Sequence, residues 1–96
     1  MMRSSGTHFG LKVEGESMID LGINDGDLAI IRSQKTAYKG EIVAAIIDGE
    51  ATLKTFSKNE DKVLLLPANQ EYNPIDVTNS DFQIAGILTG LLRSYN

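Results

Sequence analysis

The sequence predicts a single all-β domain, built mainly from short antiparallel strands with one short helical turn. Short runs of apolar and β-branched residues alternate with turn-forming residues along the chain. Helical periodicity is absent nearly everywhere, and no internal repeat is visible. With 96 residues, of which 42% are hydrophobic and 23% charged, the chain can build one hydrophobic core but not two. We therefore expect a flexible tail over residues 1–8 and one domain over residues 9–96.

The first predicted strand covers residues 9–13, where apolar and polar residues alternate. Ser17 and Asp20 then form a Ser-x-x-acid pattern that resembles a capping box and predicts one or two helical turns. A turn rich in Asn, Asp and Gly covers residues 24–27 and leads into the apolar run 28–31, which predicts a second strand.

A hairpin over residues 42–56 is the clearest local prediction. Two strand-like runs, residues 42–47 and 50–56, flank Asp48-Gly49, which is a two-residue signal for a type I′ turn. Counting outward from this turn gives the cross-strand pairs Ile47 with Glu50, Ala45 with Thr52, and Val43 with Lys54. Lys54 is therefore expected beside Val43, on the same face as Ala45 and Phe56.

The last third of the chain predicts two more strands. A turn at residues 59–61 precedes the apolar run 63–66, and the prolines and asparagines between residues 67 and 74 predict an irregular connection. The final run, residues 82–93, is long and apolar. Two glycines in it are expected at a bulge or a close backbone approach: Gly86 and Gly90.

Composition excludes several classes of function. The net charge is −4 and the nine basic residues are scattered, so this domain is not expected to contact nucleic acid directly. No apolar run approaches the roughly 20 residues of a membrane span, and no apolar block follows Arg3 as in a secretory signal. The absence of cysteine excludes disulfides and a thiolate nucleophile and fits a cytoplasmic protein. We expect no membrane contact, no metal and no cofactor.

Few residues can carry chemistry. His8, the one histidine, lies in the expected tail, where no rigid element would hold it in a catalytic triad. Residues 24–27 lack the spacing of a calcium loop, and residues 22–26 lack the lysine of a phosphate-binding loop. What remains is Ser17 beside a glycine-containing turn and Lys54 on an apolar strand face, a candidate Ser/Lys dyad.

A lysine can act as a general base only when it is neutral, so its ordinary pKa of about 10.4 must fall toward about 7. Burial disfavours the charged form and lowers the pKa in this direction. The backbone N–H groups of Glu16 and Ser17 are the expected oxyanion hole. Ordinary structural roles compete with this interpretation: Ser17 as a helix N-cap, Lys54 extending to water, and Met18 as a core residue.

Four ordered blocks resemble the LexA, UmuD and phage-repressor peptidase family. They are a V-x-G-x-S-M and G-I-x-D-G-D motif over residues 13–27, a hairpin ending in lysine over 48–54, an L-x-P-x-N segment over 65–69, and a last strand over 84–93. Ser17 and Lys54 are 37 positions apart, an interval that also resembles the family.

The resemblance implies the C-terminal self-cleavage and dimerisation domain of a LexA-like repressor of the SOS response. It implies Ser17 as the nucleophile, Lys54 as the general base, a homodimer, and a RecA filament as the activator of cleavage. The expected lining of the active site is Met18, Val43, Ala45, Thr52 and Phe56. The expected dimer interface on the last strand is Ile84, Ile87, Leu88 and Leu91.

Other functions stay open at this point. Only sixteen residues precede Ser17, so the upstream linker that the family cleaves is not visible, and neither is a DNA-binding domain. A UmuD-like accessory subunit of a lesion-bypass DNA polymerase is the main alternative. A signal peptidase would need a membrane anchor, and an inert dimerisation module would need no substrate.

Overall fold

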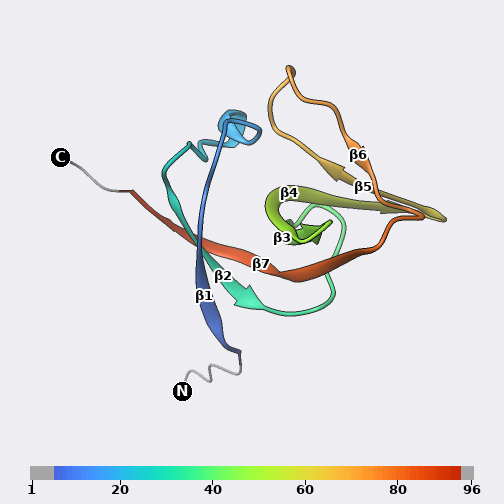
Figure 1. The fold of residues 1–96 in the computed structure, drawn as a ribbon, viewed down its shortest axis with the longest axis horizontal. Coiled ribbons are helices and arrows are strands. Elements are labelled where there is room, and N and C mark those ends of the chain that lie inside the picture. The colour runs from blue at the N-terminus through green and yellow to red at the C-terminus, as the bar shows by residue number, and fades with distance from the viewer. Residues whose placement is uncertain (1–5, 94–96) are drawn as a thin grey trace.

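Seven antiparallel strands form one sheet in the computed structural model, which describes residues 6–93 (Figure 1). In chain order they are β1 (His8–Lys12), β2 (Leu28–Ser33), β3 (Ile42–Ile47), β4 (Glu50–Asn59), β5 (Lys62–Leu66), β6 (Ile75–Asp76) and β7 (Phe82–Leu92). The helical element of the described residues is a single 3₁₀ turn, η1 (Ile19–Leu21). The predicted all-β class with one short helical turn is therefore confirmed.

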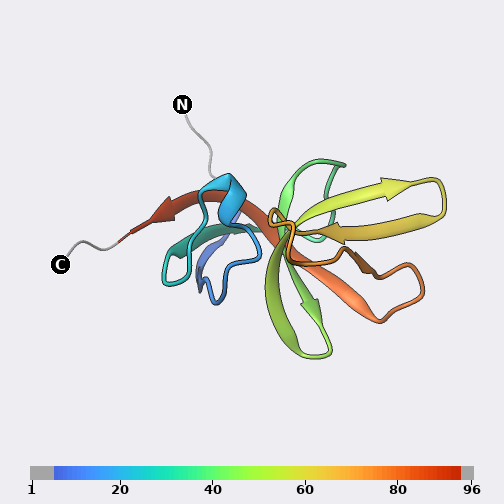
Figure 2. The same ribbon diagram turned by 90° about the horizontal axis from the view of Figure 1, so that it is seen from above.

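The last strand, β7, lies at the centre of the sheet. The strand order is β1-β2-β7-β3-β4-β5-β6, so β2 and β3 pair with opposite edges of β7. Figures 1 and 2 show the β1–β2 part on one side of β7 and the β3–β6 part on the other. The two parts of the sheet are thus joined by backbone pairing through β7.

Both predictions for the glycines of β7 are confirmed. Gly86 is buried against the neighbouring strand, and a Cβ placed on it would lie 2.3 Å from the carbonyl oxygen of Arg32. Gly90 pairs with Ile30 beside the register shift between β2 and β7, which occurs between Ile30 and Ile31. Close approach at one glycine and a bulge at the other let this central strand follow both of its neighbours.

The hairpin of β3 and β4 has the predicted register. All three expected pairs are present: Ile47 with Glu50, Ala45 with Thr52, and Val43 with Lys54. Asp48 has a φ of 51° and Gly49 a φ of 82°, and a type I′ turn requires positive φ at both central residues. Local turn chemistry therefore fixes which face of the sheet receives Lys54.

Two buried clusters form the core, and β3 contributes to both because its side chains alternate across the sheet. The first cluster contains Val13, Met18, Ile23, Ala29, Ile31, Ala44 and Leu53. The second contains Val43, Ala45, Phe56, Leu65, Val77 and Ile87.

Several element boundaries differ from the prediction. β1 begins at His8, inside the expected tail, and the N–H of Ser33 donates to the carbonyl of Thr7 at 2.7 Å. Phe9 is 37% exposed because β1 is an edge strand with a neighbour on one side only. The short strand β6 was not predicted, since its two residues carry no pattern of their own. The remainder of the expected tail, residues 1–5, lies outside the described residues.

The apolar character of β7 follows from its central position. Ile84 packs against the second cluster, and Leu88 and Leu91 pack against the first. Ile87 is 6% exposed and belongs to the second cluster, so its expected place at a dimer interface is corrected to a place in the core. β2 pairs with residues 86–92 of β7 and β3 with residues 82–87, so each edge of β7 is paired over part of its length.

Replacing Gly86 with alanine should destabilise the fold, because its Cβ would meet the Arg32 carbonyl at 2.3 Å. We expect the free energy of unfolding in urea to fall by about 1–3 kcal/mol, as for other overpacked sites. Gly90→Ala is the matched control on the same strand, because the nearest atom to its Cβ lies 3.8 Å away. Equal stability of the two variants would contradict this account of β7.

Candidate active site

Ser17 lies in the 14–27 loop, which connects β1 to β2 and is closed at its base. The N–H of Val13 donates to the Asp27 carbonyl at 2.8 Å, and the N–H of Gly26 returns a bond of 2.8 Å to the Val13 carbonyl. Within the loop, Gly15 has a φ of 84°, and its N–H donates to Asp25 Oδ1 at 2.7 Å. These bonds hold the segment that carries Ser17 against the end of the sheet.

Ser17 does not cap the helical turn that follows it. Met18 is the N-cap of η1, and no side-chain capping bond is present. The predicted capping box is therefore wrong. The Ser17 hydroxyl instead accepts a hydrogen bond of 3.0 Å from Nζ of Lys54, because the loop turns it toward β4.

Lys54 lies in the interior of β4, is 7% exposed, and donates from Nζ to two hydroxyl oxygens. One is Ser17 Oγ at 3.0 Å and the other is Thr52 Oγ1 at 2.6 Å. Burial lowers the pKa of the Lys54 ammonium below its ordinary 10.5. A neutral amine has one lone pair and two N–H groups, so it could accept the Ser17 proton while still donating to Thr52.

A small cavity of about 40 Å³ lies beside Ser17. Its walls are Leu11, Lys12, Val13, Glu14, Ser17, Met18, Ala51, Thr52 and Leu53. Met18 and Thr52 were expected there. Val43, Ala45 and Phe56 were also expected there, but they are core residues of the second cluster and do not line the cavity.

The strand end over residues 11–14 is the part of the wall that sequence reasoning missed. It meets residues 51–53 of β4 only through the folding of the whole chain, because β1 and β4 are not neighbours in the sheet. No local pattern could have indicated this contact. The hairpin register, by contrast, placed Thr52 two residues from Lys54 on the same face.

An ion pair between the buried Asp27 and the half-exposed Arg93 ties the 14–27 loop to the end of β7. Asp27 is 2% exposed, and Arg93 donates to its two carboxylate oxygens from Nε at 2.8 Å and from Nη2 at 2.7 Å. Nη2 of Arg93 also donates to the carbonyl of Gly22 at 2.8 Å. The N–H of Asn24 donates to Asp27 at 2.8 Å. The Arg93 guanidinium, with this backbone bond, lowers the pKa of the Asp27 carboxyl to about 2.

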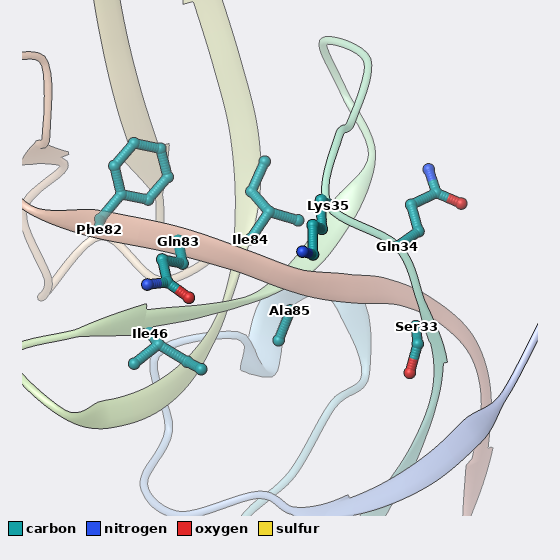
Figure 3. A pocket seen from close by; sticks show the side chains of 8 residues that line it. All are labelled: Ser33, Gln34, Lys35, Ile46, Phe82, Gln83, Ile84 and Ala85. Carbon is teal, nitrogen blue, oxygen red and sulfur yellow. The ribbon is translucent and has the colours of Figure 1, made fainter.

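A larger cavity, about 780 Å³, lies elsewhere in the described chain (Figure 3). It lies along β7 and the segment after β2 and shares no lining residue with the cavity at Ser17. Figure 3 shows Phe82 and Ile84 on one side of β7 and Gln83 and Ala85 on the other. A serine and a lysine, Ser33 and Lys35, also line this cavity. Unlike Ser17 and Lys54, they are not joined by a hydrogen bond in the described chain.

Within residues 6–93, no group of three metal-ligating side chains comes together. In the same part of the chain, no helix is long and apolar enough to cross a membrane.

The fold and the serine–lysine contact describe a peptidase-like domain, and sequence comparison agrees. The family described as Peptidase S24-like matches residues 1–89. The chain therefore belongs to the S24-like peptidase family.

Within this family, the chain is similar to repressors. It is 46% identical over 95 residues to the LexA repressor of Syntrophotalea carbinolica, which covers 98% of this chain and 47% of that protein. It is 53% identical over 89 residues to the LexA repressor of Syntrophomonas wolfei, covering 93% of this chain and 43% of the relative. A third LexA repressor, from Alcanivorax borkumensis, is 50% identical over 86 residues, 90% of this chain and 42% of the relative. The chain thus spans less than half the length of these relatives.

The Asp27–Arg93 pair predicts a specific acid dependence of stability. The pKa of Asp27 is lower in the folded state, so its contribution is complete above about pH 4 and is lost as the pH falls toward about 2. Asp27→Asn should be less stable than the unmodified chain at pH 6, and its stability should fall less between pH 4 and pH 2. Urea unfolding across this range measures both. Asp76, whose pKa is also about 2, is present in both proteins, so its contribution cancels in the comparison. Parallel pH–stability curves would therefore contradict a folded-state role for the Asp27–Arg93 pair.

The lowered pKa of Lys54 predicts a pH dependence of stability at alkaline pH. Its pKa is lower in the folded state than in the unfolded state, so the unfolded chain holds this proton more tightly and stability rises with pH up to about 10.5. In Lys54→Met this rise should be absent, and the variant should gain stability relative to the unmodified chain near neutral pH. The difference between the two pH–stability curves removes the contribution of the other titrating groups. A constant difference would contradict a lowered pKa.

Proposed function

We propose that this chain is the self-cleavage and dimerisation domain of a LexA-like repressor, in which Ser17 is the nucleophile and Lys54 its general base. The observation that carries this proposal is the 3.0 Å hydrogen bond from the buried Lys54 Nζ to Ser17 Oγ. Burial lowers the pKa of Lys54, which raises the fraction of neutral amine that can act as a base.

The reaction proceeds through an ester on Ser17. Neutral Lys54 removes the hydroxyl proton as Ser17 Oγ attacks the carbonyl carbon of the scissile peptide bond. The backbone N–H groups of Glu16 and Ser17 stabilise the negative oxygen of the tetrahedral intermediate. The carbon–nitrogen bond then breaks, and the Lys54 ammonium gives its proton to the leaving amine. Water, deprotonated by Lys54, attacks the ester, and Lys54 gives this proton to Ser17 Oγ as the ester bond breaks.

Thr52 holds the amine of Lys54 in place throughout. Its hydroxyl oxygen lies 2.6 Å from Nζ and accepts a hydrogen bond from the amine in both protonation states. This bond uses one N–H group of neutral Lys54, so the single lone pair of the amine is left for the Ser17 proton. Thr52 is a positioning residue in this mechanism.

The repressor assignment is favoured over a polymerase accessory subunit, because the relatives reported above are all named LexA repressor. From the resemblance of the sequence motifs to this family, we also propose that the cleaved bond lies on a linker of the whole protein and that a RecA filament activates the cleavage. We also propose that a second copy of the chain binds at β7, with contacts from its half-buried Ile84, Leu88 and Leu91. Sedimentation at micromolar concentration tests this pairing, and a purely monomeric profile would contradict it.

The catalytic proposal is tested by adding the linker of a LexA repressor relative upstream of residue 1 and following self-cleavage. The rate should rise with pH as Lys54 loses its proton, with a midpoint below 10.5. Lys54→Ala should lower the rate by about 10²–10⁴-fold, the usual contribution of general acid–base catalysis. Ser17→Ala should abolish ester formation.

Lys39→Ala is the matched control, because Lys39 is exposed and donates to Asn59, far from Ser17 in sequence. It should cleave at the unmodified rate with the same pH midpoint. Cleavage that survives Ser17→Ala would exclude this mechanism. Absence of any cleavage would favour an inert dimerisation module.

A further inference from the structure

The 67–69 segment, which follows β5, contacts the loop that carries Ser17. Nδ2 of Asn69 donates to the Glu16 carbonyl at 2.8 Å, and the N–H of Ala68 donates to the Ser17 carbonyl at 2.7 Å. In return, the N–H of Asp20 donates to the Ala68 carbonyl at 2.8 Å. Three bonds therefore join two segments that are about fifty residues apart in sequence.

A planar trans peptide fixes the direction of its N–H once its C=O is fixed, because the two groups point in opposite directions. The peptide between Glu16 and Ser17 contains the Glu16 carbonyl, which Asn69 holds, and the Ser17 N–H. The bond from Asn69 therefore sets the direction in which the Ser17 N–H points. The bond from Ala68 fixes the next peptide plane in the same way.

The N–H that is fixed in this way has no acceptor within the described chain. Neither Glu16 nor Ser17 donates a backbone hydrogen bond to another described residue. From Ile19 to Asn24 each N–H group is engaged, beginning with the 3.4 Å bond from Ile19 to the Glu16 carbonyl. The bond from Asn69 to the Glu16 carbonyl thus fixes the direction of the Ser17 N–H, and within the described chain this N–H remains available to a substrate oxygen.

Asn69 is itself held in one orientation. Its Oδ1 accepts the N–H of Glu71 at 2.9 Å, which leaves Nδ2 as the group that faces Glu16. The N–H of Tyr72 donates to the Asn69 carbonyl at 3.1 Å. Two residues earlier, Pro67 restricts the backbone, and the preceding strand is anchored by the fully buried Leu65. The position requires a short side chain with one donor and one acceptor, which asparagine provides.

We infer that Asn69 is a positioning residue for the oxyanion hole, acting through the Glu16–Ser17 peptide and without touching the substrate. This inference rests on the proposed function of Ser17. It assigns Asn69 a different task from Thr52, since Asn69 orients the group that stabilises negative charge while Thr52 orients the base. Loss of Asn69 should therefore slow the reaction without changing its pH midpoint.

The test uses a peptidyl fluorophosphonate, whose phosphoryl oxygen occupies the position of the oxyanion. Ser17 Oγ forms a bond to phosphorus, the P–F bond breaks, fluoride leaves, and Lys54 takes the proton. The rate of labelling is measured from pH 6 to pH 10 by mass spectrometry of the intact chain. Asn69→Ala and Asn69→Asp remove the donor, and the second keeps the acceptor for the Glu71 N–H and nearly the same shape.

Both variants should label about 10²-fold more slowly than the unmodified chain, comparable to the loss of one oxyanion donor. The pH midpoint of Asn69→Ala should equal that of the unmodified chain, because the surroundings of Lys54 do not change. Asn73→Asp is the matched control, since it places the same charge on the same connection at an exposed residue. It should label at the unmodified rate.

Unmodified labelling rates in both Asn69 variants would overturn the inference. A slower rate with a shifted midpoint in Asn69→Ala would also overturn it, because the residue would then act through Lys54. If the unmodified chain is not labelled at Ser17, the proposed function fails. The positioning claim is then decided by ¹⁵N relaxation, in which Asn69→Asp must increase the motion of the Ser17 N–H while the amides of β4 stay rigid.

Discussion

The rest of the site depends on one interaction, the hydrogen bonding of the buried Lys54 amine to two hydroxyl oxygens. A buried ammonium is costly unless hydrogen bonds replace its water, and Ser17 and Thr52 provide these bonds. Among the described residues, no buried side-chain nitrogen or oxygen lacks a partner. The same burial that makes the position costly lowers the pKa of Lys54. Stability and basicity therefore oppose one another at this residue, and the fold must compensate elsewhere.

The compensation lies in how the 14–27 loop is held. Its base is closed by backbone bonds to Val13, and its far side is tied to the end of β7 by Asp27 and Arg93. The part around Ser17 is bonded by Ala68 and Asn69. These contacts come from three separate parts of the sequence. These bonds fix the loop relative to β4, as the proposed catalytic pair requires.

Features governed by neighbouring residues could be predicted from the sequence, and features governed by distant ones could not. The Asp48-Gly49 turn determined its own hairpin register and so the face of Lys54. The Ser17 pattern was misread as a cap, because local pattern cannot show that an amine 37 residues away takes the hydroxyl. The central place of β7, the wall formed by residues 11–14 and the role of Asn69 depend in the same way on long-range packing.

The position of β7 also has a consequence for the order in which the chain is made. Ser17 belongs to the part of the sheet paired with one edge of β7, and Lys54 belongs to the part paired with the other. A nascent chain that ends before Phe82 contains both residues but lacks the strand that unites their two halves by backbone pairing. The two halves of the sheet can therefore be joined by backbone pairing only after β7 has been synthesised.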